Sequence, residues 1–406
     1  MTGFACLLVL FGTLYAFTRG AGDFAVFHSA WKLVLEGRGA TLYHATPDRF
    51  LYAPGFAFLF APLGWIPEKV ALGIWCALKA LALVLVLKRA LKVEGKLPVW
   101  VGALAVIIVA RPLMIDFQYG QVNTWILLAC WAALLGRAER ARGETERTAV
   151  IFLEWFALAV AGWAKLFPLP LLILPFLPPF FPKNGQRTQL RAERAGVMLA
   201  TFAIFGLPFL LGTNAAFALH MDWWKALQDR GLPLESHNQS LSAILHHLFT
   251  GQPTHVISLY ASRNLTWFHW FTLETVQKLT LAWAAVSGGL LLGWILARRE
   301  RSTSWGALLI GGLILPSHLV WKPYFLMALP AALVAVSSLA RSQTVRVRAW
   351  LPLALGFALI NLTGFDLMGL ELAARLEGSG AFLIGYLLIL WAAKSAKGSG
   401  VGETRR

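Results

Sequence analysis

Polar and charged residues that stand at the ends of long apolar runs are the residues of this sequence that could do chemistry. A carboxylate in such a place can act as a general base, and cationic side chains or oriented donors can stabilise a departing anion. Ionisable groups near hydrocarbon are costly, so those not explained by orientation are substrate or ion contacts by default. The candidates are Asp23, Arg111, Asp116, Gln121, Asn123, Lys165, Asn238, Gln239, His318 and Lys322.

Asp23 admits two interpretations, because it stands at the start of an apolar segment. The periodicity of Asp23–Leu35 predicts an amphipathic interfacial helix, with one apolar face and another face that carries His28 and Lys32. A carboxylate at a helix start is favoured by the helix dipole, so Asp23 could be an N-cap. The functional alternative is a general base beside the bilayer.

The other candidates also have structural alternatives. Lys165 either contacts a phosphate or extends its ammonium group toward the membrane surface. Arg111 is in a similar position, and Asp116, five residues later, could be its partner. Gln121 and Asn123 could simply form hydrogen bonds between helices.

Several polar residues are left outside the predicted site. Lys79 and Glu154 lie deeper in apolar runs and are expected to form a structural pair. The histidines of the longest hydrophilic stretch have no metal-ligand spacing, so we expect no metal. The cysteines fall in apolar runs and indicate neither a disulfide framework nor a metal site. These residues are His237, His246, His247, His255 and His269, and Cys6, Cys76 and Cys130.

Membrane helices are the elements that must position the candidates. Of the 406 residues, 58% are hydrophobic and 14% are charged, which is too apolar for a soluble chain of this size. Apolar runs long enough to cross a hydrocarbon core of about 30 Å recur along the chain, and no period-two alternation indicates a barrel. We therefore predict an all-α, polytopic integral membrane protein whose residues 1–406 form a single membrane domain.

Basic clusters predict the orientation of the chain. By the positive-inside rule six clusters are cytoplasmic, and two apolar runs separate each consecutive pair. The net charge of +16 then reports orientation, not nucleic-acid binding. The clusters are Lys88–Lys96, Arg137–Arg147, Lys183–Arg194, Arg298–Arg301, Arg341–Arg348 and Lys394–Arg406. The runs between them are Leu97–Ile115 and Val122–Gly136, Ala149–Trp163 and Leu166–Phe181, Gly196–Gly212 and Thr275–Ala297, Trp305–Leu315 and Tyr324–Ala340, and Trp350–Thr363 and Ala381–Ala393.

One apolar run must not cross if this alternation is to hold. Leu51–Ile66 is short and interrupted by prolines and glycines, so we predict that it is a re-entrant or interfacial helix, whereas Val70–Leu87 crosses. With Phe4–Phe17 as a retained first helix, about twelve helices cross and both termini are cytoplasmic. Residues 19–68 and 213–271 are then extracytoplasmic loops, and all the candidates share the extracytoplasmic face.

The segments that carry these candidates resemble glycosyltransferase family 87. The resemblance extends from Asp23 to Pro330 and departs from the family pattern at Ser317–Tyr324. Its pieces are Asp23-Phe-Ala-Val-Phe-His28-Ser-Ala-Trp31, Gly37, Leu42-Tyr43, Phe50-Leu-Tyr52-Ala-Pro54, Ala61-Pro62-Leu63, Arg111-Pro112, Gly120-Gln121-Val-Asn123, Ala164-Lys165-Leu-Phe-Pro168, Asn238-Gln239-Ser240-Leu241, and Ser317-His318 before a helix that contains Pro330.

The resemblance implies a membrane enzyme of the GT-C type that uses polyprenyl-phosphate sugars, mannose in the characterised members. It implies that Asp23 is the catalytic base. The growing negative charge of a polyprenyl-phosphate leaving group must be met by cations or oriented donors, and the candidates for this contact are Lys165, Arg111, His318 and Lys322. The candidates for substrate binding are His28, Tyr52, Gln121, Asn123, Asn238 and Gln239. The lipid-linked sugar is a cosubstrate, and no further cofactor is expected.

We therefore predict an inverting hexosyltransferase that acts on the extracytoplasmic face of a bacterial inner membrane. Its partners are the polyprenyl-phosphate sugar, a lipid or glycan acceptor and membrane lipids, with no nucleic acid. The alternative is a transporter or flippase for a lipid-linked or anionic solute, which should show repeated halves and broken helices. A catalytically inert scaffold is a third class.

Overall fold

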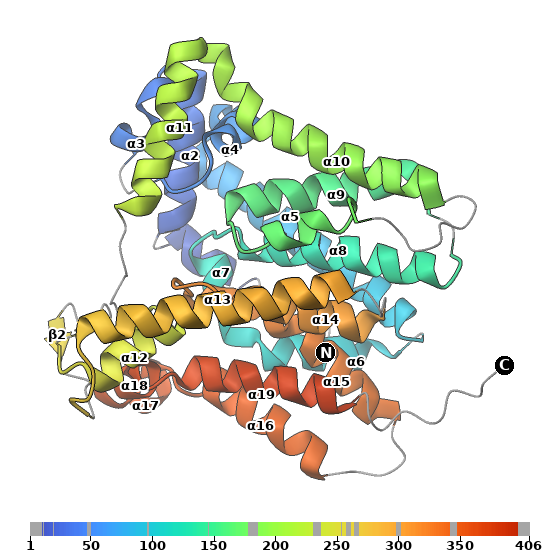
Figure 1. Ribbon diagram of the computed structural model, residues 1–406, viewed down its shortest axis with the longest axis vertical. Helices are drawn as coiled ribbons and strands as arrows, with labels where there is room; N and C mark the ends of the chain where they lie inside the picture. Colours follow the sequence, from blue (N-terminus) through green and yellow to red (C-terminus); the bar gives the residue numbers. More distant parts are fainter. Residues whose placement is uncertain are drawn as a thin grey trace. The chain divides into compact units, whose positions relative to one another are not determined.

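The structure is a computed structural model of the 406-residue chain (Figure 1). It describes residues 10, 12–18, 20–46, 50–95, 97–144, 146–177, 186–229, 237–252, 254–256, 261–263, 268–297, 302–341 and 347–396. Residues 4–9 and 11 of the expected first helix Phe4–Phe17 lie outside these residues, whereas residues 12–17 are helical. The basic cluster Arg298–Arg301 and most of Lys394–Arg406 also lie outside them. The described part is almost entirely helical, which confirms the predicted class.

Contacts divide the chain into two compact units. The N-terminal unit contains residues 9–86 and 116–231, and the C-terminal unit contains residues 1–8, 87–115 and 232–406. The chain passes from one unit to the other within α5 (Glu68–Val93) and within α7 (Ala110–Gln118). Each unit is described by itself below.

Helices of the N-terminal unit are packed around α9 and α10. Its elements are α2 (Gly22–Leu35), η1 (Gly39–Thr41), α3 (Leu42–Ala45), α4 (Pro54–Phe60), η2 (Ala61–Trp65), α8 (Asn123–Ala141), α9 (Thr148–Ala164), η3 (Leu169–Ile173), α10 (Gln186–Gly206), η4 (Leu207–Leu211) and α11 (Thr213–Gln228). Helices α9 and α10 lie side by side (Figure 1), and Gly196 makes this possible because a Cβ there would stand 2.5 Å from the Phe152 carbonyl oxygen.

Helices α9 and α10 run in the same direction, so the chain between them must return to its starting end. Gly196 lies against Phe152 near the start of α9, and Trp163 donates from Nε1 to Thr201 Oγ1 at 3.0 Å further along both helices. The returning segment was predicted as a helix over Leu166–Phe181. In its described part, to residue 177, it is instead η3 with turns, because three prolines interrupt it.

The C-terminal unit is centred on α15 (Leu329–Arg341), in which every residue from Leu329 to Ser337 is buried. Helix α15 packs against α6, α14 and α19, and α16 packs along α19. The other elements are α6 (Val99–Ile108), α12 (Leu241–Phe249), α13 (Leu273–Ala297), α14 (Thr303–Gly312), η6 (Lys322–Ala328), α16 (Val347–Asn361), α17 (Phe365–Met368), α18 (Leu370–Gly378), α19 (Ala381–Ala396), and the antiparallel strands β1 (Thr254–Val256) and β2 (Ala261–Arg263).

Four helices of the described chain are long and apolar enough to cross a membrane. Two sharply bent pairs raise the number to six if each is one span: Val99–Ile108 with Ala110–Gln118, bent by 73°, and Leu370–Gly378 with Ala381–Ala396, bent by 57°. The expected number of about twelve is therefore not confirmed, since α9, α14 and α16 are shorter than the roughly 20 residues that a crossing needs. The four are Glu68–Val93, Arg187–Leu211, Leu273–Ala297 and Lys322–Arg341.

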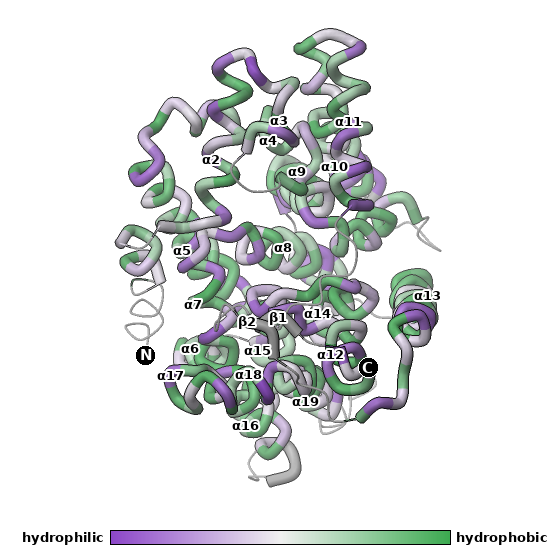
Figure 2. Tube along the Cα trace, turned by 90° about the vertical axis from the view of Figure 1, so that its left-hand side faces the viewer, coloured by the Kyte–Doolittle hydropathy of each residue, from purple (hydrophilic) through white to green (hydrophobic). Residues whose placement is uncertain are grey.

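Apolar residues dominate most of these helices, as the green colour of the tube in Figure 2 shows. The apolar run Val70–Leu87 lies within the long apolar helix α5, which has the length and composition of a membrane span. Leu51–Ile66 folds as α4 followed by η2, a broken and short apolar segment, as its prolines and glycines predicted.

Candidate active site

A chain of hydrogen bonds in the N-terminal unit joins Asp23 to Lys165 through the amide of Gln121. Gln121 donates from Nε2 to Asp23 Oδ2 at 2.6 Å. Its Oε1 accepts from Lys165 Nζ at 3.0 Å, and Lys165 also donates to Asn123 Oδ1 at 3.0 Å. The amide of Gln121 thus stands between a carboxylate and an ammonium group, with each end facing the charge that it stabilises.

Helix termini bring these residues together at one end of the unit. Asp23 lies in the first turn of α2, Asn123 begins α8, and Lys165 directly follows α9. Since α8 and α9 pack against each other in opposite directions, the start of one meets the end of the other. At the opposite end of α8, Arg137 and Arg140 pair with Glu193 of α10. These basic residues therefore lie at the end of the unit that is away from Asp23.

The turn before α8 is pressed against the start of α2. Gly120 has φ +62°, and a Cβ there would lie 2.5 Å from the Cβ of Phe24, so the position accepts only glycine. Phe24 N donates to Tyr119 O at 3.2 Å, and Trp75 Nε1 donates to Gly120 O at 3.1 Å. These contacts hold Gln121 beside Asp23.

A fully buried ion pair lies beneath this turn. Lys79 Nζ stands 2.6 Å from Asp116 Oδ2, and both side chains are 0% exposed. Asp116 also accepts from the backbone N and the Nδ2 of Asn123, each at 3.1 Å, and from Thr124 Oγ1 at 2.5 Å. Asp116 therefore caps the start of α8, and its burial removes it from the candidates for general base.

Accessibility separates the two groups that could meet a substrate from the groups that hold them. Asp23 and Lys165 are half-buried, whereas Gln121, Asn123 and Thr124 are buried. The four ionised groups Asp23, Lys165, Asp116 and Lys79 sum to zero charge. The site therefore has one partly exposed carboxylate, Asp23, and one partly exposed ammonium group, Lys165, and both are held by buried polar side chains.

The amphipathic surface helix predicted over Asp23–Leu35 is present as α2, but its surroundings differ from the prediction. Helix α2 buries residues on most of its circumference, including Phe24, Trp31 and His28. Its N-cap is Ala21, so the interpretation of Asp23 as an N-cap is wrong, although Asp23 does lie in the first turn.

His28 and Tyr52 are placed in the packed interior around α2. His28 lies with its Nε2 2.8 Å from the Ile66 carbonyl oxygen. The Tyr52 ring packs edge-on against Phe27 at 4.9 Å and along Phe56 at 5.2 Å. The structure does not bring either residue into the network of Gln121, and their substrate contacts stay a prediction.

Tyr43, close to Tyr52 in this unit, donates from its hydroxyl to the Tyr52 carbonyl oxygen at 2.7 Å. Burial of the hydroxyl and, secondarily, the carboxylate of Asp222 raise the pKa of Tyr43 well above its ordinary value. The phenol is therefore a neutral hydrogen-bond donor that fixes the chain ahead of α4.

In the C-terminal unit, Arg111 and Lys322 share one carboxylate, Glu377, that no sequence pattern predicted. Glu377 Oε1 accepts from Arg111 NH2 at 3.0 Å and from Lys322 Nζ at 2.7 Å. Both cations also lie over the ring of Phe382, at 4.8 Å and 5.9 Å. The three groups carry a net charge of +1. We call them the Glu377 cluster; no sequence signal set Glu377 apart from Glu371, the other acid of α18.

Asn238 and Gln239 fasten the start of α12 to two other segments of this unit. Asn238 Oδ1 accepts from Val320 N at 3.0 Å, and its Nδ2 donates to His318 O at 3.1 Å. Gln239 Nε2 donates to Glu377 O at 3.0 Å. His318 is exposed and meets Asn238 through its backbone, so its predicted phosphate contact stays a prediction.

Two predicted pairs are wrong. Arg111 pairs with Glu377 and Asp116 with Lys79, because five residues along a helix turn a side chain about 140° away. Lys79 does not pair with Glu154. A Cβ on Gly136 would meet Glu154 Oε2 at 2.6 Å and Arg140 at 3.0 Å, so Glu154 lies among the charged groups between α8 and α9.

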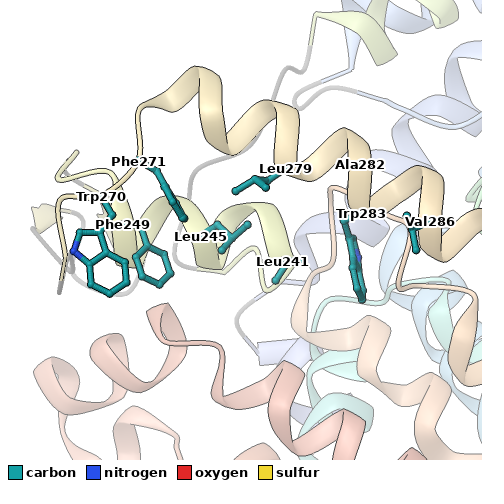
Figure 3. Close-up of a pocket in the computed structure, with 9 residues that line it drawn as sticks. All are labelled: Leu241, Leu245, Phe249, Trp270, Phe271, Leu279, Ala282, Trp283 and Val286. Carbon is teal, nitrogen blue, oxygen red and sulfur yellow. The ribbon is translucent and has the colours of Figure 1, made fainter.

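An apolar groove of about 510 Å³ lies between α12 and α13 in the C-terminal unit (Figure 3). Residues 268–271 form one end of it, where Phe268 N and Trp270 N donate to the carbonyl oxygens of Leu248 and Phe249. Trp283 is fixed at the other end by donation to Leu315 O at 2.7 Å. Its lining is Leu241, Leu245, Phe249, Trp270, Phe271, Leu279, Ala282, Trp283 and Val286.

No group of three or more His, Cys, Asp or Glu side chains that could hold a metal ion is formed by the residues that the structure describes.

Comparison with known proteins gives one match. A model of glycosyltransferase family 87 matches residues 50–323, about two thirds of the chain. Lys165, Gln121, Asn123 and Lys322 lie inside the matched range, whereas Asp23 and His28 precede it. No curated protein and no solved structure matches the chain.

Proposed function

This chain belongs to glycosyltransferase family 87 and is a membrane glycosyltransferase, and we propose that it transfers a hexose, mannose, from a polyprenyl phosphate to a hydroxyl of a lipid or glycan acceptor. The observation that carries the proposal is the amide of Gln121 between Asp23 and Lys165. It holds an accessible base and an accessible cation at a short separation, as transfer of a sugar from a phosphate requires.

Asp23 is the base in this proposal. One carboxylate oxygen takes the proton of the acceptor hydroxyl while the acceptor oxygen forms a bond to the anomeric carbon of the sugar. The bond from that carbon to the phosphate oxygen breaks, and its electron pair leaves with the polyprenyl phosphate. The configuration at the anomeric carbon inverts, and Asp23 then loses the proton to water.

Lys165 stabilises the leaving group. The polyprenyl phosphate gains negative charge as it departs, and an ammonium group held in place by two amide oxygens meets this charge without reorganising. Gln121 also orients the Asp23 carboxylate by donating to it, so one side chain fixes the position of both reacting groups.

Orientation of the site follows from charge. In the N-terminal unit the basic residues around Arg137 and Arg194 lie at the end away from Asp23, and basic residues favour the cytoplasmic side. We therefore propose an extracytoplasmic site in a bacterial inner membrane. An impermeant thiol reagent should label a cysteine at Gly37 but not at Gly143 in sealed cells, and the reverse pattern would contradict this orientation.

The family match favours a transferase over the transporter or flippase and over the inert scaffold, because the matched family consists of glycosyltransferases. The experiment that tests the finer proposal incubates the purified protein with polyprenyl-phosphate mannose, polyprenyl-phosphate glucose or a nucleotide sugar, together with membrane lipids. Mass spectrometry should detect mannosylated product with the first donor, and product from the nucleotide sugar alone would refute the proposal.

A further inference from the structure

The ion pair between Lys79 and Asp116 has no part in the proposed chemistry, since both side chains are 0% exposed. Removing two charges from water costs free energy that their mutual attraction only partly returns, so such a pair is weak evidence of stability. Its neighbours indicate a different role. Asp116 contacts both residues that start α8, Asn123 and Thr124.

Asp116 decides which way the amide of Asn123 points. Its Oδ1 accepts from Asn123 Nδ2 at 3.1 Å, which leaves Asn123 Oδ1 facing Lys165 Nζ at 3.0 Å. A flipped amide would place its NH2 group against the ammonium of Lys165, and neither group can accept a hydrogen bond. The carboxylate of Asp116 therefore keeps Asn123 in the orientation that binds Lys165.

Gln121 takes its direction from the same source. Asn123 Nδ2 donates to Gln121 Oε1 at 3.3 Å, and Lys165 donates to the same oxygen at 3.0 Å. With its oxygen turned to two donors, Gln121 must turn Nε2 toward Asp23 Oδ2, at 2.6 Å. The buried carboxylate of Asp116 therefore fixes the direction of both amides, so that their oxygens face Lys165 and the Nε2 of Gln121 faces Asp23.

Lys79 holds the backbone of the same turn. It donates to the carbonyl oxygens of Asp116 at 3.2 Å and Gln121 at 2.9 Å, while it neutralises the Asp116 carboxylate. Thr124 Oγ1 donates to Asp116 Oδ2 at 2.5 Å and so fixes the rotation of that carboxylate.

We propose that Asp116, with Lys79 as its counter-ion and Thr124 as its clamp, is a positioning residue that sets the orientation of Asp23 and Lys165 through Asn123 and Gln121. The inference rests on the proposed function, because it assigns these buried groups to the reaction of Asp23. It predicts that the charges of Asp116 and Lys79 matter for turnover even where they do not matter for folding.

A double variant separates positioning from stability. Lys79→Met with Asp116→Leu removes both charges together, so no unpaired charge is buried, and the introduced leucine has a similar branched shape but offers no oxygen to the backbone N or the Nδ2 of Asn123. The folded protein should transfer sugar about tenfold to 100-fold more slowly and should bind donor more weakly, because the amide direction is lost. Wild-type turnover in the folded double variant would overturn the inference.

Thr124 supplies a milder test that leaves both charges in place. Thr124→Val removes the hydroxyl but keeps the shape, so the melting temperature should change little while kcat falls; Thr124→Ser should restore kcat. Equal kcat in all three proteins would overturn the role of the clamp. The matched control is Arg137→Met with Glu193→Gln, an ion pair at the other end of α8, which should leave kcat unchanged.

Hydrogen exchange keeps the inference distinct from the proposed function. The backbone N–H groups of Asn123 and Thr124 donate to Asp116, so their exchange should speed up in the double variant whether or not any sugar is transferred. Absence of transfer by the wild type with every polyprenyl-phosphate sugar would reject the proposed function alone. Unchanged exchange in the double variant would reject the positioning network.

Discussion

Asp23 and Gln121 lie 98 residues apart in the chain and are joined by a hydrogen bond of 2.6 Å from Nε2 to Oδ2. The bond connects the first turn of α2 to the turn before α8. Through it, the buried amide of Gln121 orients the half-buried carboxylate of Asp23. Because the other end of that amide accepts from Lys165, any change at Gln121 affects acid and cation together.

Asp23→Asn should abolish transfer while leaving the protein folded. Asparagine keeps the size of the side chain and an oxygen that can accept from Gln121, but it cannot take a proton. Loss of a general base should lower kcat by roughly 100-fold to 10,000-fold. The changed charge in the first turn of α2 should alter the free energy of unfolding by only about 0.3–1 kcal/mol.

The control for this variant is Asp222→Asn, which removes a carboxylate from α11 that pairs with His44 and should retain full activity. Free mannose must be measured along with product, since hydrolysis without transfer would show that leaving-group stabilisation survives. Transfer by Asp23→Asn at the wild-type rate would place the base elsewhere.

Lys165→Ala should raise KM for the donor more than Lys165→Arg does. Either cation can meet the phosphate, whereas alanine leaves the charge of the phosphate unmatched and removes the ammonium group that donates to the amide oxygens of Gln121 and Asn123. Donor titration of kcat/KM at equal membrane levels measures the difference. Lys32→Ala, an exposed lysine of α2, is the control. Identical donor kinetics for Lys165→Ala and wild type would leave Lys165 a purely structural role.

Glu377→Ala should destabilise the protein more than any other single truncation in the Glu377 cluster. It leaves Arg111 and Lys322 as two buried cations without a carboxylate, which should cost about 3–5 kcal/mol in the free energy of unfolding. Glu371→Ala on the same helix breaks an exposed pair with Arg375 and should cost at most about 1 kcal/mol. Denaturant unfolding in detergent compares the two, and equal effects would contradict the buried pairing.

Mild acid should destabilise the C-terminal unit through His246. Burial lowers the pKa of His246 in the folded protein below the ordinary value of about 6.5. The unfolded chain then binds a proton first as the pH falls, so the stability from this group is complete above about pH 6.5 and is lost below it. Melting temperatures at pH 7.5 and 5.0 should differ less in His246→Phe than in wild type; equal differences would exclude this histidine.

Composition and local pattern alone were sufficient for the class of the protein and for several of its elements. High apolar content predicted membrane helices, and the apolar run Val70–Leu87 predicted α5, since a run of that length with Lys79 as its single charged residue has few other folds. Proline and glycine positions predicted the short, broken segment of α4 and η2. The family also followed from motifs in the sequence, and the family model confirms it.

Side-chain partners were decided only by the tertiary structure. Lys79 was expected beside Glu154 and pairs with Asp116, and Glu377, which the sequence did not single out, binds Arg111 and Lys322. The physical reason is that a hydrogen bond depends on an ångström-scale approach between helix faces, whereas a sequence pattern fixes only how residues are spaced along one helix. Packing of α5 against the turn before α8 therefore determined the buried support beneath Asp23, and no local pattern carried that information.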